Sequence, residues 1–116
     1  MKPPMPDCEA ERLAALRDYH ILDTQPEQVF DDVTRLASYI CKVPIATISL
    51  VDESRQWFKS KLGLDPRETP REVAFCAYAV LQQAPLIVRD ALKDERFAES
   101  ELVRKAPRIR FYAVSR

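Results

Sequence analysis

Cys76 is the first candidate for chemistry in this sequence, because a thiol can act as a redox sensor or as a nucleophile. Its neighbours Ala74, Phe75 and Ala77 carry no positive charge that would lower the pKa of the thiol. A cysteine in such surroundings ordinarily behaves as a small buried hydrophobic residue. We therefore interpret Cys76 as structural and keep it among the candidate ligand contacts.

Aromatic side chains form a second candidate site, since their rings and hydroxyls can bind and orient a planar or small amphipathic ligand. The alternative for each ring is a place in the hydrophobic core. The aromatic candidates are Trp57, Phe75, Tyr78, Phe97 and Tyr112. Asp90 is a further candidate contact, for a charged ligand, and its alternative role is that of a helix N-cap.

Several classes of function find no support in the composition. Eighteen basic and eighteen acidic residues balance, and no run of like charges suggests a nucleic-acid or membrane surface. A single glycine cannot build a glycine-rich phosphate loop, and three dispersed cysteines with one histidine fit neither a zinc motif nor a disulfide framework. No apolar stretch approaches the roughly 20 residues that span a bilayer. We expect a cytoplasmic, non-enzymatic protein with free thiols, whose cofactor is unknown.

Two helices are predicted in the first part of the chain, after a disordered leader at residues 1–6. Asp7 is placed to cap the first helix, which buries Leu13 and Leu16 and ends at Asp23-Thr24. Residues 24–27 fit a capping box for a second helix. The face of that helix expected in the core carries Val29, Phe30, Val33, Leu36, Ala37 and Ile40.

A β-hairpin is predicted next, from a β-branched segment at 45–51 and an alternating segment at 56–62. A second capping box at 69–72 then predicts a helix through about Leu81. Two further strands are expected, at 86–88 and at 109–114, and Asp90 can cap a short helix between them that reaches Phe97. The elements together predict one α+β domain at residues 7–116, an antiparallel sheet with helices packed on it.

Short phrases along this frame resemble the GAF domains of bacterial sensor histidine kinases and diguanylate cyclases. In the first half they are ERLAAL (11–16), YHILDT (19–24), PIA (44–46), SLVD (49–52), RQWFKS (55–60) and TPR (69–71). In the second half they are AFCA (74–77), DA (90–91), RF (96–97) and IRFYA (109–113). The resemblance covers the chain from about Glu9 to Ala113, in order and with familiar spacing.

The resemblance implies a ligand pocket between one face of the sheet and the helices over it, usually coupled to a dimer-forming helix. Three departures from the pattern stand out. Tyr78 occupies a position where relatives usually carry histidine, and Ala77 replaces the histidine that tends to accompany bilin attachment. Relatives also continue past the FYA phrase into two more strands and a helix, so the resemblance implies a C-terminally incomplete domain here.

Three functions remain open at this point. The first is a sensory module that binds a small ligand, self-associates or contacts an output signalling domain. The second is a cysteine-based enzyme that resembles the free methionine sulfoxide reductases, although Cys8 and Cys41 lie far along the chain from Cys76 and do not match their pattern. The third is a scaffold that only dimerises.

Overall fold

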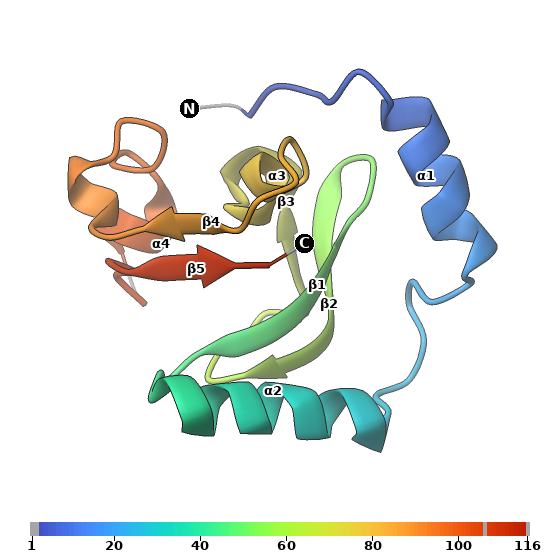
Figure 1. Cartoon of the computed structure of the whole chain (residues 1–116), viewed down its shortest axis with the longest axis horizontal. Helices are drawn as coiled ribbons and strands as arrows, with labels where there is room; N and C mark the ends of the chain where they lie inside the picture. Colours follow the sequence, from blue (N-terminus) through green and yellow to red (C-terminus); the bar gives the residue numbers. More distant parts are fainter. Residues whose placement is uncertain (1–2, 106, 116) are drawn as a thin grey trace.

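A three-stranded antiparallel sheet lies at the centre of this computed structural model, which describes residues 3–105 and 107–115. Its strands are β1 (Ala46–Val51), β2 (Arg55–Leu62) and β3 (Glu68–Pro70), in that order across the sheet (Figure 1). The predicted hairpin is confirmed, and its register shifts at a bulge between Ile48 and Ser49. The sheet and helices together confirm the predicted α+β class.

Strands β4 (Leu86–Val88) and β5 (Tyr112–Val114) form a separate two-stranded antiparallel sheet. The last strand is shorter than the predicted 109–114. Arg108 adopts a left-handed φ of 59°, and the Ile109 amide donates its hydrogen bond to the Leu102 carbonyl, not to a neighbouring strand. Within the described residues, β1 pairs only with β2 and β5 only with β4.

The helices differ from the sequence-based boundaries. The long ones are α1 (Glu9–Asp18) and α2 (Gln28–Cys41). The short ones are η1 (Arg71–Val73), α3 (Cys76–Ala79), η2 (Ala91–Lys93) and α4 (Glu101–Arg104). Helix α1 has Cys8, not Asp7, at its N-cap, and it ends before His20, whose φ of 51° is left-handed. No helix in the described part of the chain is both long and apolar enough to traverse a bilayer.

Neither predicted capping box forms. The Thr24 hydroxyl donates to the Ile21 carbonyl and accepts from Lys59, so it is not available to α2, which begins after Glu27. The second box fails because Thr69 belongs to β3, where its extended backbone pairs with Gln56. The helix predicted through Leu81 is consequently reduced to η1 and α3. Of the predicted leader, residues 1–2 lie outside the described residues, and residues 3–6 form no helix or strand.

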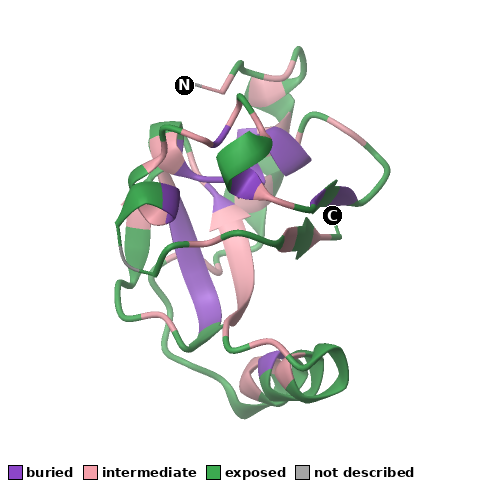
Figure 2. Cartoon of the chain, turned by 90° about the vertical axis from the view of Figure 1, so that its left-hand side faces the viewer, coloured by how far each residue is buried: buried purple, intermediate pink, exposed green. Residues whose placement is uncertain are grey.

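The orientation of α2 is the largest departure from the prediction. The helix lies along the β1–β2 hairpin, on the side opposite α3 (Figures 1 and 2). Thr34, from its polar face, is 4% exposed and meets the sheet, whereas the expected core positions Val29 and Ile40 are 64% and 65% exposed. Most of the expected face therefore points away from the core, whereas Phe30 is half-buried, with its ring centroid 5.6 Å from the Lys59 ammonium. The residues of α2 that bond to the sheet are Asp31 and Thr34, because the buried Ser60 hydroxyl of β2 needs polar partners, while Asp32 and Arg35 are exposed.

The hydrophobic core lies on the other side of the hairpin, between α3 and the β4–β5 sheet. Ala91 and Val103 are 0% exposed at its centre. The cluster combines residues of α3, β4, η2 and α4 with the ring of Phe97, and partly buried side chains of β5 pack against it. These short elements are thus held in place chiefly by one shared apolar cluster.

Gly63, the only glycine, gives a direct test of this fold. Its φ of +77° is left-handed, and a Cβ added there would collide with the Pro44 carbonyl oxygen. Because that oxygen belongs to the backbone, we expect Gly63→Ala to lower the free energy of unfolding by about 2 kcal/mol or more. Denaturant unfolding measures the loss. The exposed Glu72→Ala is the control, and a Gly63→Ala protein as stable as this control would contradict the close approach.

Candidate functional site

Four of the five aromatic candidates come together in the structure. The ring of Phe75 stacks on Phe97 at 4.2 Å between centroids and meets Tyr112 edge-on at 4.9 Å. Tyr78 contacts Phe97 edge-on at 5.1 Å. We call Phe75, Tyr78, Phe97 and Tyr112 the aromatic cluster. These rings pack on one another within the hydrophobic core.

Trp57 is not brought to the aromatic cluster. It is 7% exposed on β2, where its backbone lies opposite Leu50 of β1 and Glu68 of β3. Trp57 lies on the hairpin, as the sequence predicted. It is not among the residues of the hydrophobic core that contains the aromatic cluster. A ligand role for Trp57 therefore stays a prediction, as does its use as a fluorescent reporter.

The Cys76 thiol lies against the edge of the aromatic cluster, with its sulfur 2.7 Å from the Tyr112 hydroxyl. Burial raises the pKa of Cys76, although hydrogen bonds with Tyr112 and Ser49 oppose the shift. Burial, assisted by the neighbouring Cys76, likewise raises the pKa of Tyr112. Both groups are therefore neutral near pH 7, so the thiol is poorly suited to nucleophilic chemistry. The geometry supports the structural interpretation of Cys76.

An ion pair covers the outer edge of the aromatic cluster. The guanidinium of Arg96 lies 5.1 Å from the Phe97 ring centroid and 5.7 Å from that of Tyr78, and it pairs with the Asp94 carboxylate at 2.8 Å. Hydrogen bonding from Arg96 lowers the pKa of Asp94. The Tyr78 hydroxyl, on a residue 9% exposed, has no hydrogen-bond partner among the described residues. A polar atom in that state is a place where a ligand or water would be stabilised.

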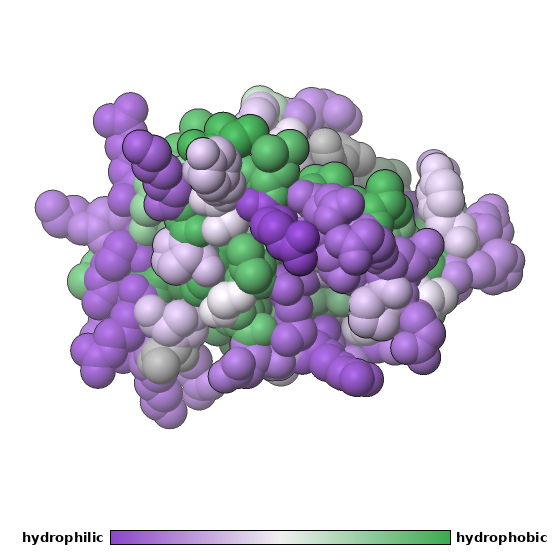
Figure 3. All heavy atoms as spheres, turned by 90° about the horizontal axis from the view of Figure 1, so that it is seen from below, coloured by the Kyte–Doolittle hydropathy of each residue, from purple (hydrophilic) through white to green (hydrophobic). Residues whose placement is uncertain are grey.

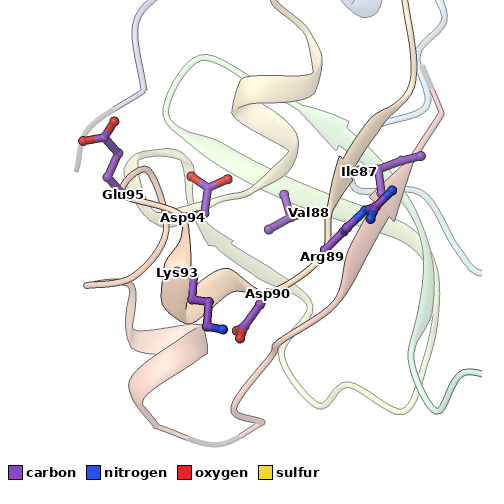
Figure 4. A pocket seen from close by; sticks show the side chains of 7 residues that line it. All are labelled: Ile87, Val88, Arg89, Asp90, Lys93, Asp94 and Glu95. Atoms are coloured by element: carbon purple, nitrogen blue, oxygen red, sulfur yellow. The ribbon is translucent and has the colours of Figure 1, made fainter.

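A shallow surface depression of about 690 Å³, open to solvent and called the cavity below, lies beside this ion pair. Figure 4 shows the side chains that line it, from β4 through η2 and the following turn. They are Ile87, Val88, Arg89, Asp90, Lys93, Asp94 and Glu95. Asp90 is thus at a cavity as the ligand hypothesis requires, and its carboxylate also accepts from the Leu92 amide as an N-cap. Both roles proposed for Asp90 are compatible with this position.

The remaining lining residues were missed by sequence reasoning. Arg89, Lys93 and Glu95 are exposed charges with no periodic pattern, so nothing in the sequence distinguishes them from an ordinary solvated surface. A second cavity of about 150 Å³ is lined by Phe97, Arg96 and residues of η1 and α4. It is too small for most ligands. The described residues hold no group of three histidine, cysteine or acidic side chains arranged for a metal ion.

The mixed fold, with an antiparallel hairpin and short helices over an aromatic core, belongs to a known class of domain. The GAF domain family model matches residues 25–115, and the chain is a member of the GAF family. This confirms the family seen in the sequence phrases.

A relative is also found among characterised signalling proteins. The chain is 42% identical over 111 residues to a cyclic di-GMP phosphodiesterase of Pseudomonas aeruginosa. The match covers 96% of this chain and 19% of the relative, so the chain spans about a fifth of that protein's length. The narrower assignment to the histidine kinase and diguanylate cyclase type stays a prediction, because this relative is a phosphodiesterase.

The buried thiol gives a second test. Cys8 and Cys41 are exposed and free, whereas Cys76 is buried with a raised pKa, so at about pH 8 its reactive thiolate fraction is lower than that of an ordinary cysteine. We expect a disulfide reagent to modify two thiols rapidly in the folded protein and the third only after unfolding. Tyr112→Phe removes the hydrogen bond but keeps the ring, and it should preserve this pattern. Three rapidly reacting thiols in the native protein would contradict the burial of Cys76.

Proposed function

We propose that this chain is a non-catalytic regulatory GAF module of a signalling protein and that it senses a small polar molecule in the cavity beside β4 and η2. Membership of the GAF family and the likeness to part of a cyclic di-GMP phosphodiesterase support the signalling role. The observation that carries the ligand proposal is the cavity of about 690 Å³, which adjoins the ion pair over the aromatic cluster.

The charges around the cavity favour a particular class of ligand. Arg89 and Lys93 supply positive charge, and Glu95 supplies negative charge. Asp94 is already paired with Arg96, and Asp90 already caps η2. A small zwitterion, with an anionic and a cationic group a few ångströms apart, complements this mixture better than a polyanion does. The exposed side chain of Ile87 adds an apolar contact.

In this proposal, ligand binding is transmitted to the aromatic cluster through Asp94. Asp94 lines the cavity, and the same carboxylate fixes Arg96, whose guanidinium lies over the rings of Tyr78 and Phe97. A ligand cation that competes for Asp94 would release Arg96 and expose the edge of the aromatic cluster. The unpartnered Tyr78 hydroxyl would then gain access to solvent or ligand.

The cysteine-enzyme alternative is less well supported. The two exposed thiols lie at the N-cap of α1 and the end of α2, while Cys76 is buried on α3. A disulfide requires two sulfurs in contact, and a reductase requires a reactive thiolate, which the raised pKa of Cys76 disfavours.

Ligand binding is tested with a panel of free amino acids as zwitterionic probes, read by thermal shift and by NMR titration of the 116-residue chain. A binding amino acid should raise the melting temperature. Lys93→Ala and Glu95→Ala should each weaken binding about tenfold, because each removes one charge-assisted contact.

Lys105→Ala is the matched control, since Lys105 is an exposed lysine outside the cavity and should leave affinity unchanged. A panel in which no amino acid shifts the melting temperature would contradict the zwitterion site. Binding that is insensitive to both Lys93→Ala and Glu95→Ala would place the ligand elsewhere.

A separate test concerns catalysis. We expect the purified chain to show no cyclic di-GMP hydrolysis and no kinase or cyclase activity, because its sequence carries neither a glycine-rich phosphate loop nor a two-metal carboxylate motif. Product formation is followed by chromatography with each nucleotide substrate. Turnover that a single cavity substitution abolishes would overturn the non-catalytic assignment.

A further inference from the structure

Helix α1 is attached to the rest of the molecule mainly by charged groups. Of its residues, all of which the structure describes, only Leu13 is buried. Figure 3 views the molecule from the α2 side, and hydrophilic residues make up most of its right-hand end, where Figure 1 places α1. The ion pair between Arg17 and Glu53 is solvent-exposed at 3.5 Å, and such pairs contribute little. The attachment of α1 therefore depends on its first turn.

One carboxylate lies at the centre of the contacts in that turn. Glu9 accepts from both terminal nitrogens of Arg71, at 2.9 and 3.1 Å, and from Arg12 at distances between 2.7 and 3.0 Å. Arg71 is 5% exposed and belongs to η1, whereas Arg12 belongs to α1 itself. Burial raises the pKa of Glu9, but hydrogen bonds from Arg71 and Arg12 lower it overall, so the carboxylate is ionised near neutral pH.

The contacts of α1 with the hairpin depend on the same carboxylate. Arg12 donates to the Val51 carbonyl at 2.6 Å, and Arg71 donates to the Asp52 carbonyl at 3.0 Å. Glu9 contacts both guanidinium groups and neutralises part of their charge. If Glu9 lost its charge, two cations would remain close together with little access to water, which is costly. Glu9 thus holds the first turn of α1 against the hairpin.

The connection after α1 is suited to act as a hinge. His20 and Asp23 adopt left-handed φ values of 51° and 61°, which are uncommon for residues other than glycine. Beyond this point the chain is fixed, because Asp23 pairs with Arg55 at 2.8 Å and Lys59 binds the segment that follows. A movement of α1 would therefore be absorbed at residues 19–22 and would leave the start of α2 in place.

Undocking of α1 is coupled to its unfolding. The helix has 10 residues, and isolated helices shorter than about 12 residues are marginal in water. Its apolar residues are not gathered on one face, and its N-cap residue, Cys8, makes no side-chain hydrogen bond to the helix. Without its contacts to the hairpin, α1 would lose its helical hydrogen bonds. The segment therefore has a docked, ordered state and an undocked, disordered state.

We propose that α1 is a latch that opens from the hairpin by local unfolding and that the pair of Glu9 and Arg71 holds it closed. Opening brings the guanidinium of Arg71, which is buried in the closed state, into contact with water. The latch goes beyond the ligand-binding role proposed above and does not depend on it, because none of its residues lines the cavity.

Hydrogen–deuterium exchange of the 116-residue chain tests the latch, because local opening exposes the amides of α1 while the rest of the domain stays protected. Glu9→Gln keeps the size of the side chain and removes its charge. We expect the amides at 9–18 to exchange about tenfold faster or more in this variant. The amides of β1 and β2 should exchange as in the unmodified chain.

Glu11→Gln is the matched control. Glu11 is exposed in the same first turn, and it forms neither a hydrogen bond nor an ion pair with any described residue. The control therefore reproduces the loss of a negative charge near the helix N-terminus without the loss of the contact with Arg71. A double-mutant cycle with Arg71→Met assigns the effect to the pair, because Glu9→Gln should change the exchange of α1 less in that background.

Two kinds of result would overturn the proposal. If exchange accelerates equally in α1, the hairpin and the β4–β5 sheet, or if the Glu9→Gln chain does not fold, α1 opens only when the whole domain unfolds. If Glu9→Gln leaves the exchange of α1 unchanged, or if Glu11→Gln accelerates it as much, Glu9 does not hold the latch closed. An undiminished effect of Glu9→Gln in the Arg71→Met background would likewise exclude the pair.

Discussion

The buried ammonium of Lys59 constrains much of this structure. Its side chain is 0% exposed, and its nitrogen lies 2.7 Å from the Thr24 hydroxyl, 2.6 Å from the Gln25 carbonyl and 2.7 Å from the Glu27 carboxylate. Three donors thus meet three acceptors, which is what a charge out of contact with water requires. The chain at 24–27 must therefore cross β2, and α2 must begin immediately after it.

The direction of α2 follows from that crossing, and with it the division of the molecule into two unlike sides. On the α2 side of the hairpin, the contacts are hydroxyls, a carboxylate and an ammonium. On the other side, the aromatic cluster and the aliphatic residues of β4 and α4 supply apolar burial. A polar interface of this kind fixes position without adding much net stability, while the aromatic side contributes most of the hydrophobic driving force.

A second set of charges attaches the N-terminal helix. Arg71 is 5% exposed and reaches the Glu9 carboxylate at 2.9 Å and the Asp52 carbonyl at 3.0 Å, and Arg12 donates to the Val51 carbonyl at 2.6 Å. Helix α1 precedes the part of the chain that matches the GAF family model, and Leu13 is its one buried residue. It is therefore held to the hairpin turn mainly by charge-assisted hydrogen bonds, which are directional.

The sequence by itself determined the family, the α+β class and the hairpin, because these depend on local residue type and on phrases carried by neighbouring positions. Of the five aromatic candidates that it suggested, Phe75, Tyr78, Phe97 and Tyr112 lie together in the structure and Trp57 lies elsewhere. The capping boxes, the charged lining of the cavity and the orientation of α2 were decided by tertiary structure. Periodicity shows that a helix has an apolar face, but not which face meets the sheet. That choice depended on Ser60, which is distant in sequence and hydrogen-bonds to Asp31 and Thr34 of α2. Lys59 fixes where the helix begins, because its ammonium binds the segment at 24–27 that precedes α2.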